Sequence, residues 1–154
     1  MTLEHRFKKT SGLDEVVKMF RKAAEQGDAT AQKVLGLCYD GAYGVEEDLT
    51  EAVKWFRKAA EQGDATSQRI IGRSYETGYG GVERNPFEEI KWYRKAAEQG
   101  DATAQYSLGS YYKNGYCGIV DKDLAEAVKW YRKAAEQGNK YAKVQLQKLQ
   151  EMGY

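Results

Sequence analysis

The side chains that could do covalent chemistry are few, and one pair of them has a spacing that catalysis can use. Ser110 and Lys113 are separated by two residues, so on a helix they would lie about one turn apart. A serine becomes a nucleophile when a nearby basic group takes its proton, and this spacing would allow it. No S-D-N or K-T-G element accompanies the pair. A hydrolase built on Ser110 and Lys113 is therefore kept as the alternative prediction.

Other reactive side chains form no recognisable site. The single histidine is His5, and the two cysteines, Cys38 and Cys117, lie far apart in the chain. Such a set cannot by itself ligate a structural zinc or build a disulfide framework. The sequence also lacks a Walker-type phosphate loop and an H-E-x-x-H motif. We therefore expect no catalytic residue, no metal and no cofactor, and we expect a protein that is not an enzyme.

Composition narrows the class of protein further. The chain has 154 residues, which favours one domain, and its 24 Lys and Arg against 23 Asp and Glu give a net charge of +1. This balance argues against nucleic acid as the partner. No apolar run approaches the roughly 18 residues of a membrane helix. The first residues do not have the pattern of a secretory signal, so we expect a cytoplasmic protein, although a chain trimmed of its signal would look the same.

An internal repeat determines which elements carry these side chains. The letters RKAAEQGDATAQ occur at 21–32 and again unchanged at 94–105, while 57–68 differ at one letter and RKAAEQG returns at 132–138. The period is about 37 residues, which is typical of helix-pair repeats. One helix pair of this size cannot bury its own apolar face, so the pairs must stack. The sequence therefore predicts an all-α solenoid.

Local signals place the helices. An aspartate that can cap a helix precedes the first helix of each unit, and a capping box such as Asp48 with Glu51 begins the second. We expect eight helices, at about 13–26, 29–41, 48–62, 65–77, 86–99, 102–114, 123–137 and 140–152. The domain would span 13–154, with repeats at 28–63, 64–100 and 101–138 between cap helices at 13–26 and 140–152, after a flexible lead-in at 1–12.

A long motif recurs through these units and resembles the Sel1-like repeat family. In the first unit it consists of Leu35-Gly36, Tyr39, Val45, Asp48, Ala52, Trp55-Phe56, Lys58-Ala59-Ala60 and Gln62-Gly63. The resemblance implies a right-handed superhelix, related to tetratricopeptide repeats, that acts as a protein-interaction scaffold or adaptor. Some members have been linked to penicillin binding, so the alternative is a penicillin- or peptidoglycan-related hydrolase or binder. A secreted branch carries a cysteine pair in each repeat, which this chain lacks.

The surface positions of the first helices vary between units while the core positions do not. In related helical-repeat folds these helices line the concave side, so we expect a protein or peptide to bind there. The candidate groove residues are Lys33, Leu37, Arg69, Arg73, Tyr106, Ser110 and Lys113. Arg and Tyr are frequent interface anchors. The other interpretation is ordinary solvated helix surface.

Three tyrosines, Tyr43, Tyr79 and Tyr116, occupy equivalent places in the variable loops. They could form an exposed edge that holds a partner, or fold back over the glycine-rich turn, which we favour because tyrosine is commonly half-buried. The second helices carry repeated basic triplets, as at Lys54, Arg57 and Lys58. These could contact an anionic surface, but we expect surface ion pairs such as Arg57 with Glu61.

Two further positions depart from the repeat. Glu89 stands where other units have alanine at the centre of an apolar face. Because a buried unpaired carboxylate is costly, we expect a small helix rotation that lets Glu89 reach water, with a buried polar pocket as the alternative. The first helices of the other units contain a glycine, at Gly36, Gly72 and Gly109, which we expect to permit close approach of the partner helix. Gln147 replaces this glycine, as expected of a terminal helix. We expect a monomer, with end-to-end stacking left open.

Overall fold

The computed structural model describes the backbone of residues 3–154 and the side chains of residues 12–154. The predicted lead-in, 1–12, lies outside the residues with described side chains except at Gly12, but its described backbone is helical from Leu3, so α1 begins earlier than the expected start at 13. Eight α-helices occur in the described part: α1 (Leu3–Glu25), α2 (Ala29–Asp40), α3 (Leu49–Glu61), α4 (Ala65–Thr77), α5 (Pro86–Glu98), α6 (Ala102–Asn114), α7 (Leu124–Glu136) and α8 (Lys140–Glu151). A 3₁₀ turn, η1 (Tyr79–Gly81), follows α4. From α2 to α8 the predicted helices are confirmed to within one residue at each end.

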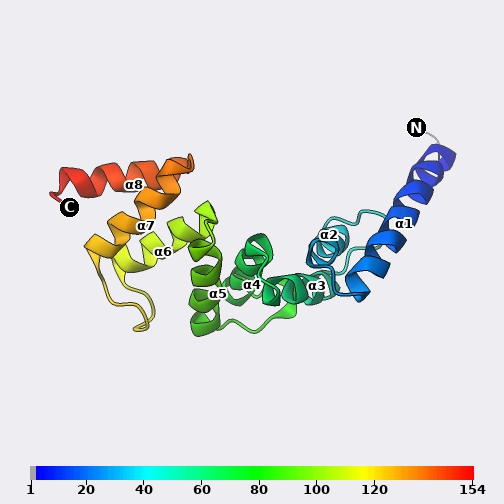
Figure 1. Ribbon diagram of the computed structural model, residues 1–154, viewed down its shortest axis with the longest axis horizontal. Coiled ribbons are helices and arrows are strands. Elements are labelled where there is room, and N and C mark those ends of the chain that lie inside the picture. The colour runs from blue at the N-terminus through cyan, green and yellow to red at the C-terminus, as the bar shows by residue number, and fades with distance from the viewer. Residues whose placement is uncertain (1–2) are drawn as a thin grey trace.

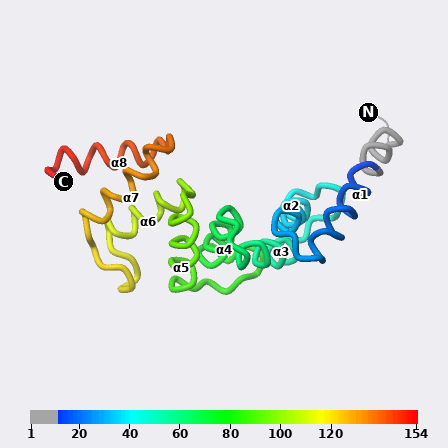
Figure 2. Tube along the Cα trace, viewed as in Figure 1, coloured from blue at the N-terminus to red at the C-terminus, as the bar shows by residue number. Residues whose placement is uncertain are grey.

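The helices stack in sequence order as an α-solenoid. The most extensive contacts join α2 to α3, α4 to α5 and α6 to α7, and these pairs contact one another through α3 with α4 and α5 with α6. Figure 1 shows the result as an extended array with the two ends of the chain far apart. The trace in Figure 2 follows the same path from α1 to α8. Each repeat therefore contacts mainly its neighbours.

Side-chain caps account for the agreement at the helix starts. Asp28, Asp64 and Asp101 accept hydrogen bonds from the third backbone N–H of α2, α4 and α6. Asp48 and Asp123 do the same for α3 and α7. Each cap satisfies one of the N–H groups that a helix start leaves unpaired. The caps are local signals, which is why the sequence alone could place these ends.

Glycine inside the first helix permits the close approach within each pair. A Cβ at Gly36 would lie 2.8 Å from the ring of Phe56, and one at Gly109 would lie 2.6 Å from the ring of Tyr131. Real Cβ atoms do not approach this closely, so any larger residue would force the helices apart. The expected reason for these glycines, close approach of the partner helix, is confirmed.

A buried glutamine ladder, which the sequence analysis did not foresee, joins consecutive repeats. Gln68 is buried and donates to the Ala60 carbonyl oxygen at 3.2 Å, while its own carbonyl oxygen accepts from Gln99 at 2.6 Å. Gln32 and Gln105 repeat this arrangement: each donates to a carbonyl oxygen of the preceding second helix, and accepts from Gln62 or Gln137 at the end of the second helix of its own repeat. A buried amide needs such partners to offset its lost hydration.

Candidate binding groove on the first helices

Two of the predicted groove cations are held in contacts between repeats. The Lys33 Nζ lies 2.9 Å from Asp64, and the Arg69 Nε lies 3.1 Å from Asp101. These aspartates are the caps of α4 and α6, so each cation joins its own helix to the start of the next first helix. Burial opposes ionisation of Asp64, but its bonds to Lys33 and Ser67 outweigh that effect, and the pKa of this carboxyl lies below its ordinary value.

The C-terminal part of the predicted groove is also occupied by internal contacts. The Tyr106 ring packs between Tyr131 and Tyr141, with centroids 5.7 and 6.1 Å away. The Lys113 Nζ donates to the Gln145 side chain at 2.6 Å. Tyr106 stands in the repeat where Lys33 and Arg69 stand, and like them it contacts the following first helix.

The structure does not assemble Ser110 and Lys113 as a nucleophile and base. The Ser110 hydroxyl donates to the Tyr106 carbonyl oxygen at 3.2 Å and lies 3.0 Å from the Tyr131 hydroxyl, whereas Lys113 is turned to Gln145. Burial raises the pKa of Tyr131, so this phenol is not a base at neutral pH. The hydrogen bonds of the pair are structural.

A cavity of about 310 Å³ lies where α2, α3, α4 and η1 meet. Its lining comprises Asp40, Phe56, Arg69, Ile70, Arg73 and Tyr79. The Arg73 side chain is exposed and has no ion pair or side-chain hydrogen bond among the described residues. Leu37, which occupies the position of Arg73 in the preceding first helix, is 43% exposed. Arg73 and Leu37 are thus the predicted groove residues for which the structure shows no polar partner.

The three loop tyrosines do not form one edge. Tyr79 lines the cavity and donates its hydroxyl to Asp40, and Tyr116 stacks on Tyr111 with ring centroids 4.4 Å apart. Tyr43 is 60% exposed, but its ring also lies over the turn, where it leaves no room for a Cβ at Gly41. The favoured packed arrangement thus describes all three tyrosines, and Tyr43 stays mostly exposed.

Glu89 is buried, which makes the predicted helix rotation wrong. Its side chain is 1% exposed and accepts hydrogen bonds from the hydroxyls of Tyr111 and Tyr116, the latter at 2.9 Å. Burial raises the pKa of Glu89 above its ordinary value, and the two phenol donors counter this only in part. The carboxylate stays buried because Tyr111 stands where the other units have Cys38 and Ser74, so the next repeat supplies its donors.

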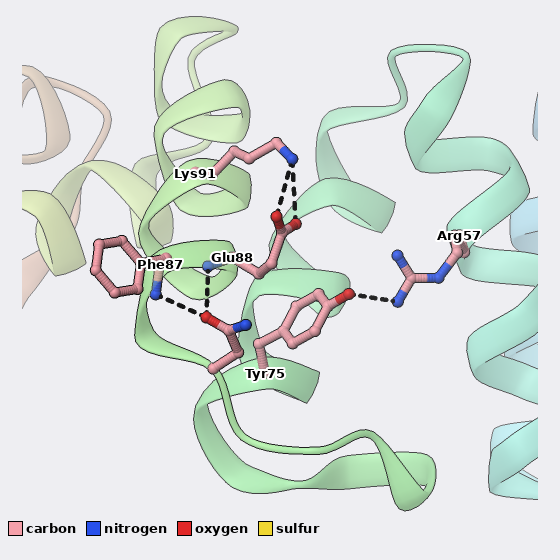
Figure 3. Close-up of polar contacts among 6 residues, drawn as sticks. Arg57, Tyr75, Phe87, Glu88 and Lys91 are labelled. Carbon is pink, nitrogen blue, oxygen red and sulfur yellow. Dashed lines mark hydrogen bonds and ion pairs between the residues drawn. The ribbon is translucent and has the colours of Figure 1, made fainter.

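The basic triplets of the second helices are also used internally, and the expected Arg57–Glu61 pairing is wrong. Figure 3 shows Arg57 reaching from α3 to the hydroxyl of Tyr75 on α4, at 3.2 Å. Arg21 and Arg94 make the same bond with the equivalent tyrosines, Tyr39 and Tyr112. Arginine prefers these contacts because it can also lie over the ring, as Arg57 does 5.4 Å from the Tyr75 centroid.

The lysines of the triplets have partners on their own helices. Lys91 contacts Glu88 one turn earlier at 3.0 Å, at the start of α5 where Asn85 caps Phe87 and Glu88 (Figure 3). The Lys58 ammonium lies 4.3 Å from the Trp55 ring centroid. The first lysine of each triplet is thus neutralised by a glutamate of its own helix, whereas the arginines and lysines that contact rings are held in place but keep their charge.

These features define a helical-repeat solenoid, and the repeat itself identifies the family. The model of the Sel1 repeat matches residues 17–28, 29–64, 65–101 and 102–139. The protein therefore belongs to the Sel1 repeat family, whose members generally act as protein-interaction scaffolds. No curated protein sequence matches the chain.

Solved structures support the same assignment. A protective antigen of uropathogenic Escherichia coli with the SLR fold is 38% identical, with a TM-score of 0.81 over 91% of this chain and 29% of that chain. A Sel1 repeat protein from Oxalobacter formigenes is 36% identical, with a TM-score of 0.79 over 87% of this chain and 38% of that one. The chain thus spans less than two fifths of either relative. Helicobacter pylori cysteine rich protein B, 23% identical with a TM-score of 0.63 over 86% of this chain and 93% of that one, shows the shared fold.

Neither a membrane-spanning helix nor a metal-holding cluster occurs among the described residues. No helix in this part of the chain combines the length and apolar character needed to cross a bilayer. No group of three or more His, Cys, Asp and Glu side chains gathers there in an arrangement that could hold a metal ion.

Proposed function

We propose that the protein is a non-catalytic interaction scaffold that binds a protein or peptide segment along α2, α4 and α6. The observation that carries this proposal is the cavity of about 310 Å³ on α2 and α4, which Arg73 lines with a guanidinium that has no internal partner. Arginine is frequent among the residues that dominate binding energy. Leu37 adds exposed apolar surface on the same row of helices.

The stacking contacts support a preformed surface. The Lys33–Asp64 and Arg69–Asp101 ion pairs fix α2 against α4 and α4 against α6, and the glutamine ladder joins each of these first helices to the ends of the second helices on either side. A surface that is already ordered loses less conformational entropy when a partner binds. The residues that vary between repeats then determine which partner is held. A monomeric state, a protein or peptide partner and a cytoplasmic location remain predictions.

The hydrolase alternative has no observation in its favour. Ser110 is bonded to Tyr106 and Tyr131, and Lys113 to Gln145. We therefore propose no catalytic role for either residue.

Selection from a random-peptide phage library on the immobilised protein tests the scaffold proposal. Backbone amide chemical shifts of the ¹⁵N-labelled protein, recorded with and without a selected peptide, locate its binding surface. We expect the largest changes on α2, α4 and α6. Changes confined to α3, α5 and α7, or failure to enrich any peptide, would show that the proposed groove does not bind peptides.

A further inference from the structure

The geometry points to an acidic side chain of a bound peptide as the occupant of the cavity on α2 and α4. In this arrangement a glutamate or aspartate of the partner places its carboxylate on Arg73, and its aliphatic part packs against Ile70 and Phe56. This inference rests on the proposed function, because it specifies the chemistry of the segment that the groove binds. It assigns the selectivity of the groove for an acidic residue to one position, that of Arg73.

The charges around the cavity define where an anion fits. Arg69 is already paired with Asp101, and Asp40 already accepts from the Tyr79 hydroxyl. Burial first, and then the bond to Asp40, raise the pKa of Tyr79, while the charge of Arg73 lowers it. The cavity lining therefore combines Asp40, whose carboxylate is already bonded to Tyr79, with Arg73, whose guanidinium has no side-chain partner among the described residues. A ligand carboxylate is attracted to Arg73, because a guanidinium can donate two parallel hydrogen bonds.

The equivalent place in the next repeat shows what distinguishes this cavity. There Ser110 replaces Arg73 and Tyr93 replaces Phe56. The Tyr93 hydroxyl donates to Glu76, the equivalent of Asp40, at 2.7 Å. That repeat thus satisfies its acid with a phenol from its own second helix and carries no guanidinium. Phe56 has no hydroxyl, so an apolar ring edge lines the cavity beside Arg73.

The size of the cavity is consistent with a side chain as its occupant. About 310 Å³ is at the lower limit of small-molecule sites, which span about 300–1,000 Å³. An acidic side chain with part of its backbone needs no larger space. The aliphatic lining by Ile70 and the ring of Phe56 favours a carboxylate on a short hydrocarbon stem over a bare inorganic anion.

The test uses peptides selected on the wild-type protein, with affinity measured by isothermal titration calorimetry. We expect peptides that shift amides of α2 and α4 to contain a Glu or Asp whose change to Gln or Asn weakens binding about tenfold or more. Arg73→Ser, which introduces the residue found at the equivalent Ser110, should weaken the acidic peptide by a similar factor. Arg73→Ser should not change the affinity of the peptide in which the acidic residue is already Gln or Asn. The substitution in the protein and the one in the peptide would each remove the same interaction.

Matched variants separate the cavity from general electrostatics. Phe56→Tyr introduces the ring found at Tyr93 and Tyr131, and its hydroxyl should narrow the cavity and weaken the acidic peptide. Lys91→Ser removes an exposed cation from α5 and should leave affinity unchanged. Amidation of the peptide C-terminus should have no effect, and a large loss on amidation would overturn the side-chain assignment. Circular dichroism confirms that each variant is folded.

Two results would overturn the inference while leaving the scaffold proposal intact. One is a set of peptides that bind on α2 and α4 without any acidic residue. The other is an acidic peptide for which the loss of affinity on changing its acidic residue to the amide and the loss on Arg73→Ser are independent, so that the two factors multiply when both changes are made. Peptides that bind only on the second helices would instead contradict the scaffold proposal itself.

Discussion

Replacing Gln68 by alanine tests whether the glutamine ladder holds the repeats together. The side chain is buried and makes two hydrogen bonds, to the Ala60 carbonyl and from Gln99. Each bond contributes about 1 kcal/mol, and the Cγ methylene, which alanine lacks, adds about 0.8 kcal/mol. Freeing a glutamine side chain from its fixed rotamer returns about 1.5 kcal/mol of this. The Ala60 carbonyl keeps its bond from the Gly63 N–H, so no large orphan penalty is added.

The expected net loss is therefore about 1 kcal/mol of unfolding free energy. Urea denaturation followed by circular dichroism measures it, and amide hydrogen exchange in α4 and α5 shows whether the loss is local, because helical repeats need not unfold in one step. Gln147→Ala is the matched control, since Gln147 is exposed on α8 and should change stability by less than about 0.5 kcal/mol. Equal effects of the two substitutions would refute the stabilising role of the ladder.

Two further substitutions test the interior. Because the pKa of Glu89 is raised in the folded protein, its contribution to stability is present below the ordinary glutamate range and is lost as the pH rises through the raised value. Glu89→Gln should therefore lose less stability than wild type as the pH rises above the ordinary glutamate range, measured as the melting temperature against pH, and parallel curves would contradict this. Gly109→Ala should lower the unfolding free energy by about 1–2 kcal/mol, because its Cβ would lie 2.6 Å from the Tyr131 ring. Gly12→Ala, with no atom within 4 Å of its Cβ, should raise stability by up to about 1 kcal/mol. Chemical denaturation measures the unfolding free energy of both variants. A change of the same sign in Gly109→Ala and Gly12→Ala would exclude close packing as the cause.

The sequence was sufficient for the helices because their signals are local. A cap such as Asp48 and the glycine that ends a helix lie within a few residues of the ends they determine. Stacking followed from the period, since one helix pair leaves its apolar face uncovered. The same reasoning predicted the close approach at Gly36, which the ring of Phe56 confirms.

The side-chain partners could not be predicted in the same way, because they belong to other repeats. Arg57 was expected to pair with Glu61 on its own helix, but it reaches Tyr75 on the next one. Lys33 was placed on the outward side of α2 by its helical angle, yet a long side chain can bend from that side to the cap of the following first helix, Asp64. Helical periodicity gives the direction in which a side chain leaves its own helix. It contains no information about where the neighbouring helices lie, and so cannot name the partner of that side chain.

A comparison of equivalent positions would have supplied part of this information. Glu89 stands at a position where other units have alanine, and the next unit has Tyr111 where others have Cys38 and Ser74. Two departures from the repeat that face each other across one interface indicate a compensated pair. The hydrogen bond from Tyr111 to Glu89 is the physical form of that compensation.

The same comparison explains why so little of the predicted groove remains available. Leu37, Arg73 and Ser110 occupy one position in successive first helices, and the hydrogen bonds of the neighbouring rings determine whether each stays free. The Tyr131 hydroxyl of the same unit lies 3.0 Å from Ser110, so that position is closed by an internal bond. Tyr93 stands in the place of Tyr131 for Arg73, but its hydroxyl donates to Glu76. Phe56 of the preceding unit carries no hydroxyl, and it lines the cavity together with Arg73. The repeated residues thus fix the stacking, while the hydrogen-bond partners of the neighbouring tyrosines determine which variable position stays open.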